Sequence, residues 1–559
     1  MKNLVVARVL YKIADYLEIQ EADFKPIAYR RAAQNIENLS EPIEDYAKNN
    51  KLEDIPGVGK GIAYKIEEIL KTGTCNELEK LKKQIPVDVE GLMSVEGIGP
   101  RKVKVLYKKL KIKNLKDLEI AAKQGKIRKL EDFGEKSEKN ILEGLSFVKK
   151  HKGRFLLGDA LLIAEDVRDY LLIKTKKAVI GGSLRRFEET IGDVDVLTVG
   201  DEKLVEYFLK YKDIAKVLAK GGTKCSVMMD NGMQVDLRLI KDNQFGAALQ
   251  YFTGNKEHNI ELRKIAIKKG YKLNEYGLFK GNKIIASKTE EEVYKNLGLN
   301  YIQPELRTNT GEIEAAKKKL PRLVELKDIK GDLQLHSKWS DGNDDIQAIV
   351  DNAKKLGYGY VAITDHFGSL RIANSLNSKM IRKQWKEIEK LNKNSKVVIL
   401  KGAEVNIKMN GELDIDLQTL KELDYVIAAV HNGLKNDVTK RILKAMENKY
   451  VNSIAHPSGR LINKREGYAL DYEKLFNKSL ETGTVFEINS NPERLDLDWM
   501  HVKEAVNLKC KLLINTDAHS TDSMNFMKFG VGVARKGWCE NKNIINTLAF
   551  NKLKHVLNK

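Results

Sequence analysis

The sequence has few cysteines and no long apolar run. Its four cysteines lie far apart in 559 residues, and none forms a C-x-x-C pair. This spacing excludes a disulfide framework and a zinc ribbon, and it fits a reducing compartment. Because no run of about eighteen apolar residues occurs, neither a membrane span nor a membrane partner is expected. The amphipathic first twenty residues carry acidic side chains and no cleavage site, so we expect a cytoplasmic protein.

The composition is that of a protein with buried cores and a basic surface. The chain is 42% hydrophobic and 31% charged. Its length predicts several domains. The formal net charge of +20 favours a polyanionic partner, because neutralising phosphates releases counterions. No self-complementary surface stands out, so we expect a monomer.

The stretch GGSLRRFEETIGDVDVL, residues 181–197, carries the clearest chemistry. Asp193 and Asp195 alternate with apolar residues, so both project from one face of a strand and suit Mg²⁺. The upstream glycines let backbone N–H groups approach an anion, and two arginines add positive charge. Asp236, in the apolar run QVDLRLI, offers a third carboxylate on a neighbouring strand. A lone D-x-D can also be a polar strand edge, but the combination favours nucleotidyl transfer.

This stretch resembles the palm of the family X DNA polymerases, the family of DNA polymerase beta. The sequence downstream extends the resemblance, with YFTG at residues 251–254 and NEYGL from residue 274. The resemblance covers nearly the whole chain, because the C-terminal part is similar to a PHP phosphoesterase domain. It implies a polymerase that binds deoxynucleoside triphosphates and gapped or nicked double-stranded DNA. The implied substrate-binding residues are Gly182, Ser183, Arg186, Tyr251, Phe252, Gly254, Asn259 and Arg263.

The resemblance also implies a two-metal mechanism with Mg²⁺ or Mn²⁺. Asp193 and Asp195 would bridge both ions, and Asp236 would hold only the ion near the primer 3′-hydroxyl. Tyr251 and Phe252 would crowd a 2′-hydroxyl. The alternative for these two aromatic residues is an ordinary place in the core.

Glycine hairpins recur in the N-terminal part, where apolar residues have helical spacing. IPGVGKGIAYKI places Gly57 and Gly59 between two helices, and VEGIGPRKVKVL places Gly97 and Gly99 in the same way. A looser copy, FGEKSEKNIL, lies near Gly134. Because lysine or arginine follows each hairpin, the repeats predict helix-hairpin-helix units that hold the DNA backbone without reading its sequence.

The first domain resembles the lyase domain of DNA polymerase beta through FKPIAYRRAA and the first hairpin. The resemblance places Lys25, Tyr29 and Arg30 at a gap 5′-phosphate, and Lys65 at the Schiff-base position. Such a lysine must be a neutral amine. Glu77 stands near a position where the family has a further lysine, and a phosphate-contacting surface role for Lys65 stays open.

Six apolar runs in the C-terminal part each end in a possible metal ligand, and helical stretches separate them. This alternation predicts a parallel sheet with ligands at its carboxyl edge. Mixed imidazole and carboxylate ligands suit Zn²⁺ or Mn²⁺ and water attack on a phosphoester. Asp365 stands at one of these strand ends. The PHP pattern implies the ligands His336, Asp341, His366, Glu404, His431, His456, Asp517 and His519. The usual opening H-x-H is Gln334-Leu335-His336 here, so we expect either that one ion binds weakly or that activity requires a different ion.

We therefore expect a multidomain chain: helical helix-hairpin-helix domains, an α+β nucleotidyltransferase palm, and a distorted (β/α) barrel. The expected parts are 1–82, lyase-like; 83–150, a second hairpin subdomain; 151–242, the palm; 243–302, nucleotide selection; 303–329, a linker; and 330–559, the PHP domain.

The preferred interpretation is a DNA repair polymerase of the base excision repair type, with a PHP domain that trims 3′ ends or cuts at abasic sites. A second hypothesis makes the PHP domain a structural or DNA-holding module. A metabolite phosphatase and an RNA end-adding nucleotidyltransferase are disfavoured, because neither needs the hairpins.

Overall fold

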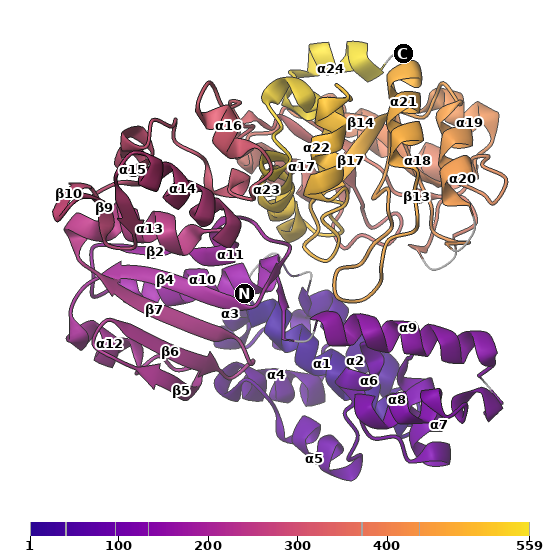
Figure 1. Cartoon of the computed structure of the whole chain (residues 1–559). Helices are drawn as coiled ribbons and strands as arrows, with labels where there is room; N and C mark the ends of the chain where they lie inside the picture. The colour runs from indigo at the N-terminus through magenta and orange to yellow at the C-terminus, as the bar shows by residue number, and fades with distance from the viewer. Residues whose placement is uncertain are drawn as a thin grey trace.

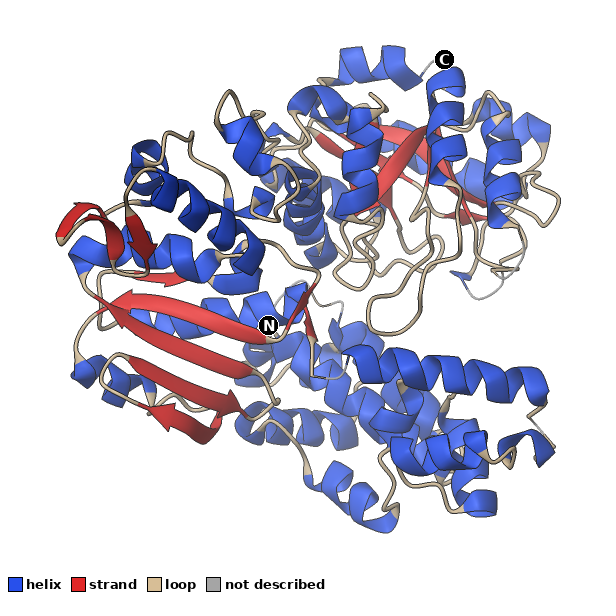
Figure 2. Cartoon of the chain, in the orientation of Figure 1, coloured by secondary structure: helices blue, strands red, loops and turns tan. Residues whose placement is uncertain are grey.

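The computed structural model describes residues 2–37, 39, 42–95, 97–131, 133–151, 153–370, 373–434 and 437–557. Figure 1 shows a helical N-terminal part, a palm sheet, a small thumb and a C-terminal barrel. Figure 2 shows strands only in the last three parts. None of the helices in the described ranges is long and apolar enough to cross a membrane.

The N-terminal part is built around α1 (Lys2–Ile19). Val6, Leu10, Ile13 and Leu17 recur at three- and four-residue spacing and are all buried, as an amphipathic helix requires. Its apolar core contains residues from 6 to 145. The other helices here are α2 (Lys25–Glu37), α3 (Ile43–Lys48), α4 (Lys60–Thr72), α5 (Asn76–Gln84), α6 (Val89–Met93), α7 (Pro100–Leu110), α8 (Leu115–Lys123) and α9 (Glu135–His151).

The palm is a mixed five-stranded sheet, which confirms the expected α+β palm, and its strand order is β2-β4-β7-β6-β5. Strands β4 and β7 run parallel, whereas the other neighbours are antiparallel. Helix α10 (Leu157–Leu172) packs against β2 and β4. The strands are β2 (Ala178–Ile180), β4 (Asp193–Val199), β5 (Ile214–Lys220), β6 (Lys224–Met229) and β7 (Gln234–Ile240).

The thumb, residues 245–316, joins a three-stranded antiparallel sheet to four helices. The segment 303–329, expected as a linker, is folded against it: Leu306, Ile313 and Ala316 belong to the thumb core, and Arg307 is fully buried. The elements are α13 (Phe245–Thr253), α14 (Lys256–Lys268), β8 (Lys272–Asn274), β9 (Gly277–Lys280), β10 (Lys283–Ala286), α15 (Glu290–Asn296) and α16 (Glu312–Ala316).

The C-terminal part is an eight-stranded sheet whose paired strands are all parallel. A bridge between Leu335 and Ala518 brings the first strand to the last, so the barrel is nearly closed. The strands are almost continuously buried, as expected where helices cover the sheet. They are β11 (Gly331–Leu335), β12 (Tyr360–Ile363), β13 (His366–Phe367), β14 (Val398–Asn406), β15 (Tyr425–Ala429), β16 (Ser453–Ile454), β17 (Val485–Asn489) and β18 (Leu512–Asn515).

Aspartate N-caps start five of the barrel helices. In each, the side chain accepts a hydrogen bond from a backbone N–H two or three residues ahead, which satisfies a donor of the first turn. Asp345, Asp416, Asp437, Asp471 and Asp498 cap α17 (Ile346–Lys355), α19 (Leu417–Glu422), α20 (Val438–Met446), α21 (Tyr472–Thr482) and α22 (Trp499–Asn507). The other barrel helices are α18 (Ser378–Asn392), α23 (Met527–Lys536) and α24 (Phe550–Leu557).

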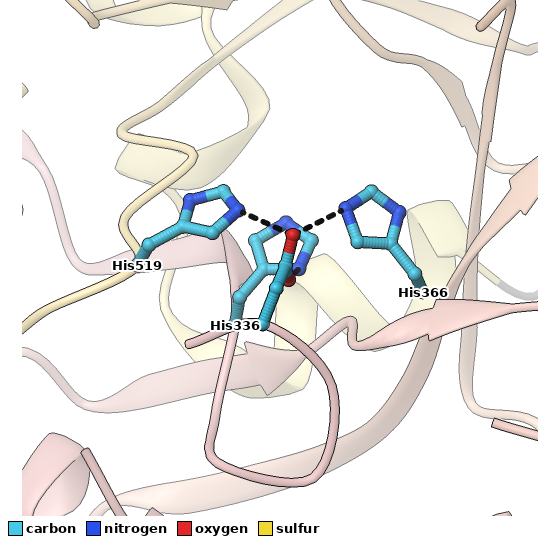
Figure 3. Close-up of side chains that lie close together, drawn as sticks. His336, His366 and His519 are labelled. Atoms are coloured by element: carbon cyan, nitrogen blue, oxygen red, sulfur yellow. Dashed lines mark ion pairs between the residues drawn. The ribbon is translucent and has the colours of Figure 1, made fainter. Parts of the chain in front are cut away.

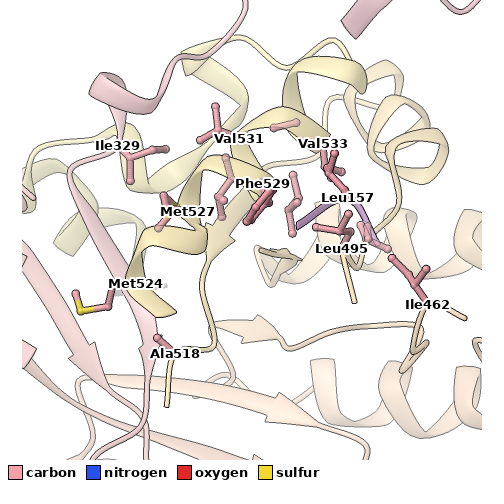
Figure 4. Close-up of a cluster of buried hydrophobic side chains, with 14 of the residues drawn as sticks. Leu157, Ile329, Ile462, Leu495, Ala518, Met524, Met527, Phe529, Val531 and Val533 are labelled. Carbon is pink, nitrogen blue, oxygen red and sulfur yellow. The ribbon is translucent and has the colours of Figure 1, made fainter. Parts of the chain in front are cut away.

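One apolar cluster spans the palm and the barrel, and the barrel strands carry a second cluster of their own. The first cluster contains Leu157 of the palm and Phe529 and Val533 of α23, which Figure 4 shows close together. A Cβ atom at Gly532 would lie 2.0 Å from a ring carbon of Phe187 in the palm. The two parts are therefore in close van der Waals contact.

Candidate active sites

The three palm carboxylates lie on neighbouring strands. Asp195 and Asp236 are paired in register between β4 and β7, and Asp193 lies two residues earlier on β4. Because side chains two apart share a face, all three project from the same side of the sheet. Asp193 is exposed and Asp236 is buried. The predicted metal-binding residues are thus brought together.

These carboxylates lie in a field of opposing charges. Burial raises the pKa of Asp195 to about 6, Asp193 and Asp236 add to the increase, and Arg238 opposes it. Burial would also raise the pKa of Asp236, but hydrogen bonds, foremost from Lys224, lower it overall. The Lys224 Nζ atom lies 2.8 Å from an Asp236 oxygen. A divalent cation would bind in competition with these cations.

The glycine turn adjoins the carboxylates directly. Gly181 N–H donates to the backbone oxygen of Asp195 at 2.8 Å. Gly182 has φ +62°, and a Cβ atom there would lie 2.7 Å from an Asp195 carboxylate oxygen. Only glycine tolerates both conditions without strain. An anion on this turn would therefore lie beside a metal held by Asp195.

The two arginines after the turn have different surroundings. Arg185 forms a buried ion pair with Glu290 of α15, at 2.6 Å from Nη2 to Oε2, and Glu290 also pairs with Arg307 at 2.6 Å. Arg186 donates through Nη1 to the backbone oxygen of Thr253. Both arginines thus join the palm to the thumb, Arg185 through a carboxylate and Arg186 through a backbone oxygen.

The aromatic pair of the thumb faces the palm site. The rings of Tyr251 and Phe252 meet edge to face with centroids 5.1 Å apart, and the Arg238 guanidinium lies 4.0 Å from the Phe252 centroid. Asn259 donates to the backbone oxygen of Tyr251 at 2.8 Å, so it fixes the last helical turn of α13, which bears both rings. Arg263 is exposed on α14. Gly254 has φ +68° and lies close to the Arg186 side chain.

The barrel brings its eight predicted ligands together at the carboxyl ends of the strands. Glu404 is central: its oxygens lie 3.2 Å from His336 Nε2 and 3.0 Å from His431 Nε2. Asp341 Oδ2 lies 3.5 Å from both His366 and His519, and Figure 3 shows these two imidazoles on either side of a carboxylate. Two further contacts complete the group: Asp517 Oδ1 lies 3.1 Å from His336 Nε2, and His456 Nε2 lies 3.3 Å from Glu404 Oε1.

The donor set fits divalent metal ions. Three subsets place their ligand atoms within 4.8 Å of one another, namely His336-Asp341-His366-His519, His366-Glu404-His431 and His336-Glu404-Asp517. Burial would favour the protonated form of Glu404, but the surrounding histidines lower its pKa well below the usual range. Burial lowers the pKa of His366 to about 4, which leaves the neutral imidazole that binds metals.

Two neighbours of this cluster play other parts. The Gln334 amide donates to Glu404 Oε2 at 2.9 Å, whereas its own Oε1 is buried without a hydrogen bond among the described residues. Asp365 accepts hydrogen bonds from Ser337 and Ser340 and belongs to none of the three ligand subsets. Asp365 therefore holds the loop after β11.

The lyase-like residues are only partly grouped. Lys65 Nζ lies 5.9 Å from the centroid of the Tyr29 ring, which is buried, and Lys25 is exposed. Arg30 is held at 2.7 Å by both Asp15 and Glu18. Arg30 is thus neutralised within the domain, which the sequence pattern did not suggest.

The first two glycine hairpins have the same backbone. Gly57 and Gly97 have φ near +80°, and Gly59 and Gly99 are N-caps with extended conformations. These four glycines are solvent-accessible at the N-termini of α4 and α7, where free amides attract phosphate. Gly134, in the looser third copy, is not among the glycines with positive φ.

Sequence reasoning missed several charged residues at the palm. Lys224 and Arg238 contact the carboxylates, and Glu290 and Arg307 secure Arg185. The period-two alternation of QVDLRLI could have placed Arg238 on the face of Asp236. Nothing local indicated the other three.

A mixed palm with three carboxylates beside a glycine turn, joined to a barrel with a histidine and carboxylate cluster, defines a nucleotidyltransferase fused to a PHP-type metal centre. Residues 248–308 match the DNA polymerase beta thumb, and 332–489 match the PHP domain. Residues 1–75 match a helix-hairpin-helix domain, and 89–146 a SAM-like helix-hairpin-helix tandem. The chain belongs to the family X DNA polymerases that carry a C-terminal PHP domain.

Relatives support this placement along the whole chain. The sequence is 38% identical to "DNA polymerase/3'-5' exonuclease PolX" of Bacillus subtilis (strain 168) over 570 residues, which covers 99% of each chain. It is 24% identical to DNA polymerase lambda of Rattus norvegicus, over 54% of this chain and 56% of that one. It is 37% identical to repair DNA polymerase X of African swine fever virus, over 24% of this chain and 83% of that one.

Proposed function

We propose that this chain is a DNA-directed DNA polymerase that fills short gaps in base excision repair, with a PHP domain that acts as a 3′–5′ exonuclease. The observation that carries the polymerase part is the in-register pair Asp195 and Asp236 beside the glycine turn. The full-length similarity to a polymerase/3′–5′ exonuclease supports both activities. The substrates are gapped or nicked DNA and deoxynucleoside triphosphates.

The palm residues bind the metals and the triphosphate. Two Mg²⁺ or Mn²⁺ ions, when bound, would neutralise the triphosphate and lower the pKa of the primer 3′-hydroxyl. Asp193 and Asp195 would hold both ions, and Asp236 the one near the primer. Ser183 and Arg186 would bind the phosphates, together with the backbone of Gly182.

The thumb residues select the nucleotide. Tyr251 and Phe252 would lie against the sugar, where their fixed edge-to-face packing leaves little room for a 2′-hydroxyl. Arg263 would face the template, and Asn259 would reach the base pair or, through its bond to Tyr251, position that ring.

The barrel residues form the nuclease centre. Zn²⁺ or Mn²⁺ ions would supply a water activated for attack on a phosphodiester. Glu404 lies between His336, His431 and His456 and would orient ligands of more than one ion. The same centre would also hydrolyse the backbone at abasic sites. In a separate reaction, Lys65 of the N-terminal domain would be the lyase nucleophile.

One observation favours a second candidate for the barrel. Gln334 replaces an imidazole with a neutral amide that donates to Glu404 instead of binding a metal. If this change disables the centre, the barrel is a structural or DNA-holding module. We further propose that the protein is a cytoplasmic monomer, in keeping with its four buried free cysteines.

A gap-filling assay tests both activities at once. The substrate is a one-nucleotide gap with a 5′-phosphate and a labelled primer, incubated in Mn²⁺ with or without deoxynucleoside triphosphates. Asp193→Ala should reduce extension at least about a hundredfold, because metal charge stabilises the transition state by several kcal/mol. His336→Ala should abolish primer shortening and leave extension intact.

Matched surface variants control this assay. Asp230→Ala and His555→Ala remove an exposed aspartate of the palm and an exposed histidine of α24, and both activities should persist. A wild type that extends but never shortens the primer, over a range of Mn²⁺ and Zn²⁺, would make the barrel a scaffold. A wild type that does not extend would refute the polymerase.

A further inference from the structure

A short strap connects the glycine turn to the barrel. Phe187, Glu188 and Glu189 directly follow Arg186, and all three contact barrel residues. Phe187 packs on Gly532. The Glu189 carboxylate accepts hydrogen bonds from both terminal nitrogens of Arg460, at 2.6 and 3.0 Å. The strap also closes on the turn itself, because Glu188 N–H donates to the Ser183 backbone oxygen at 3.1 Å.

Lys536, at the end of α23, reaches the centre of this strap. It is only 1% exposed, although lysine is almost never fully buried without a partner. Its Nζ atom lies 2.7 Å from Glu188 Oε2 and 3.5 Å from the Arg186 backbone oxygen. Its charge also lies 5.2 Å from the Trp499 ring centroid. A barrel cation is thus held between a barrel ring and a palm carboxylate.

The Glu188 carboxylate joins two cations from different domains. One oxygen faces Lys536, and the other lies 3.5 Å from Arg186 Nε. Arg186 is itself mostly enclosed, with 13% of its side chain exposed. In such surroundings a charge is poorly screened, so the position of the carboxylate affects the guanidinium strongly.

We propose that Lys536 is a positioning residue for the polymerase: through Glu188 it holds Arg186 in the orientation that binds the triphosphate, so the barrel sets the nucleotide affinity of the palm. This rests on the proposed polymerase function. Lys536 touches no substrate and acts only through the carboxylate. Without it, Glu188 is free to pair with Arg186 fully and turn the guanidinium from the substrate.

The test is steady-state filling of a one-nucleotide gap by full-length Lys536→Met, Glu188→Gln and the double variant. Each single change should raise KM for the nucleotide about tenfold, the effect of losing one charge-assisted hydrogen bond, with kcat nearly unchanged. A change in KM alone identifies binding that is equal in ground and transition states. The double variant should be no worse than the worse single, because both act through one contact.

Arg460→Met is the matched control. It breaks the neighbouring contact of the same strap, to Glu189, and should leave KM unchanged. An equal rise in KM for this variant would mean general loosening of the interface and would overturn the role of Lys536. If Lys536→Met does not fold, Glu188→Gln tests the same contact from the palm, and its KM decides.

The outcomes separate this inference from the function on which it rests. If the wild type extends the primer but Lys536→Met has an unchanged KM, the inference alone is overturned. The same holds if the effects of the two single changes multiply in the double variant. Absence of extension by the wild type would overturn the polymerase assignment and the inference with it. Retained primer shortening by the variants reports an intact barrel.

Discussion

Gln334 lies beside the barrel cluster, at a position where the PHP pattern has a histidine ligand. Its amide nitrogen faces Glu404, and its oxygen is buried without a hydrogen bond among the residues described. A buried amide oxygen without a donor costs free energy unless a cation or water satisfies it. The position therefore has room for a better ligand.

We expect Gln334→His to increase metal binding. An added imidazole supplies a nitrogen donor, and a change of this kind alters metal affinity about tenfold or more. Metal content per chain after loading with Mn²⁺ or Zn²⁺, measured by mass spectrometry, should rise by about one ion. Gln334→Ala removes the amide without adding a donor and should gain none. Equal metal content in wild type and Gln334→His would contradict the expectation.

Residue types and their spacing were sufficient to bring seven of the barrel ligands to one edge, because every strand of a parallel barrel ends there. Asp341, in the loop after β11, followed only from the resemblance to the PHP pattern, and the strand-end pattern pointed to Asp365 instead. The palm carboxylates followed from period-two alternation for the same kind of reason. The partners of these groups did not follow. Lys224 comes from β6, and Arg307 lies in a segment whose polar, lysine-rich sequence resembled a plain linker. Their roles depend on which elements, distant in the sequence, pack together. A local sequence pattern does not indicate such long-range contacts.

At the scale of elements, a buried triad joins the palm turn to the thumb. Glu290, in the first turn of α15, pairs with Arg185 and with the fully buried Arg307. Burial would raise the pKa of Glu290, but the two arginines lower it to about 2. Because the folded pKa is below the usual 4.5, this contribution to stability is present above pH 4.5 and is lost as the pH falls toward 2.

Glu290→Gln should destabilise the thumb by about 3 to 5 kcal/mol, because it leaves two arginines without their carboxylate. Urea unfolding at neutral pH measures the change. Glu291→Gln, an exposed change in the same helical turn, should cost less than about 0.5 kcal/mol. Similar losses for both variants would show that the triad contributes little beyond helix capping.

At the scale of the whole molecule, the apolar clusters do not follow the domain boundaries, so we expect palm and barrel to unfold together. The N-terminal core includes only residues from 6 to 145, whereas one large cluster spans palm and barrel beside a smaller cluster within the barrel. An exposed ion pair between Arg8 and Asp159 connects the N-terminal part to the palm. Exposed pairs contribute about 0 to 1 kcal/mol, too little to couple unfolding.

Calorimetry should therefore resolve the N-terminal part from a unit that contains palm and barrel. Mn²⁺ should raise the melting temperature of that unit alone. At a hundredfold excess of Mn²⁺ over Kd, binding adds about 2.7 kcal/mol to the free energy of unfolding. His336→Ala should reduce the shift. Separate melting of palm and barrel, or a metal effect on every transition, would be inconsistent with the shared core.

The shared core also constrains how this gene can change. A truncation before residue 330 would expose Leu157 and Phe187 to water and remove the partner of Glu188, so a shortened descendant would inherit a damaged polymerase. Loss of the nuclease is then open to selection only through single substitutions among the ligands, which leave the packing in place. Lineages of this architecture should accordingly keep a full-length barrel long after its metal centre has decayed.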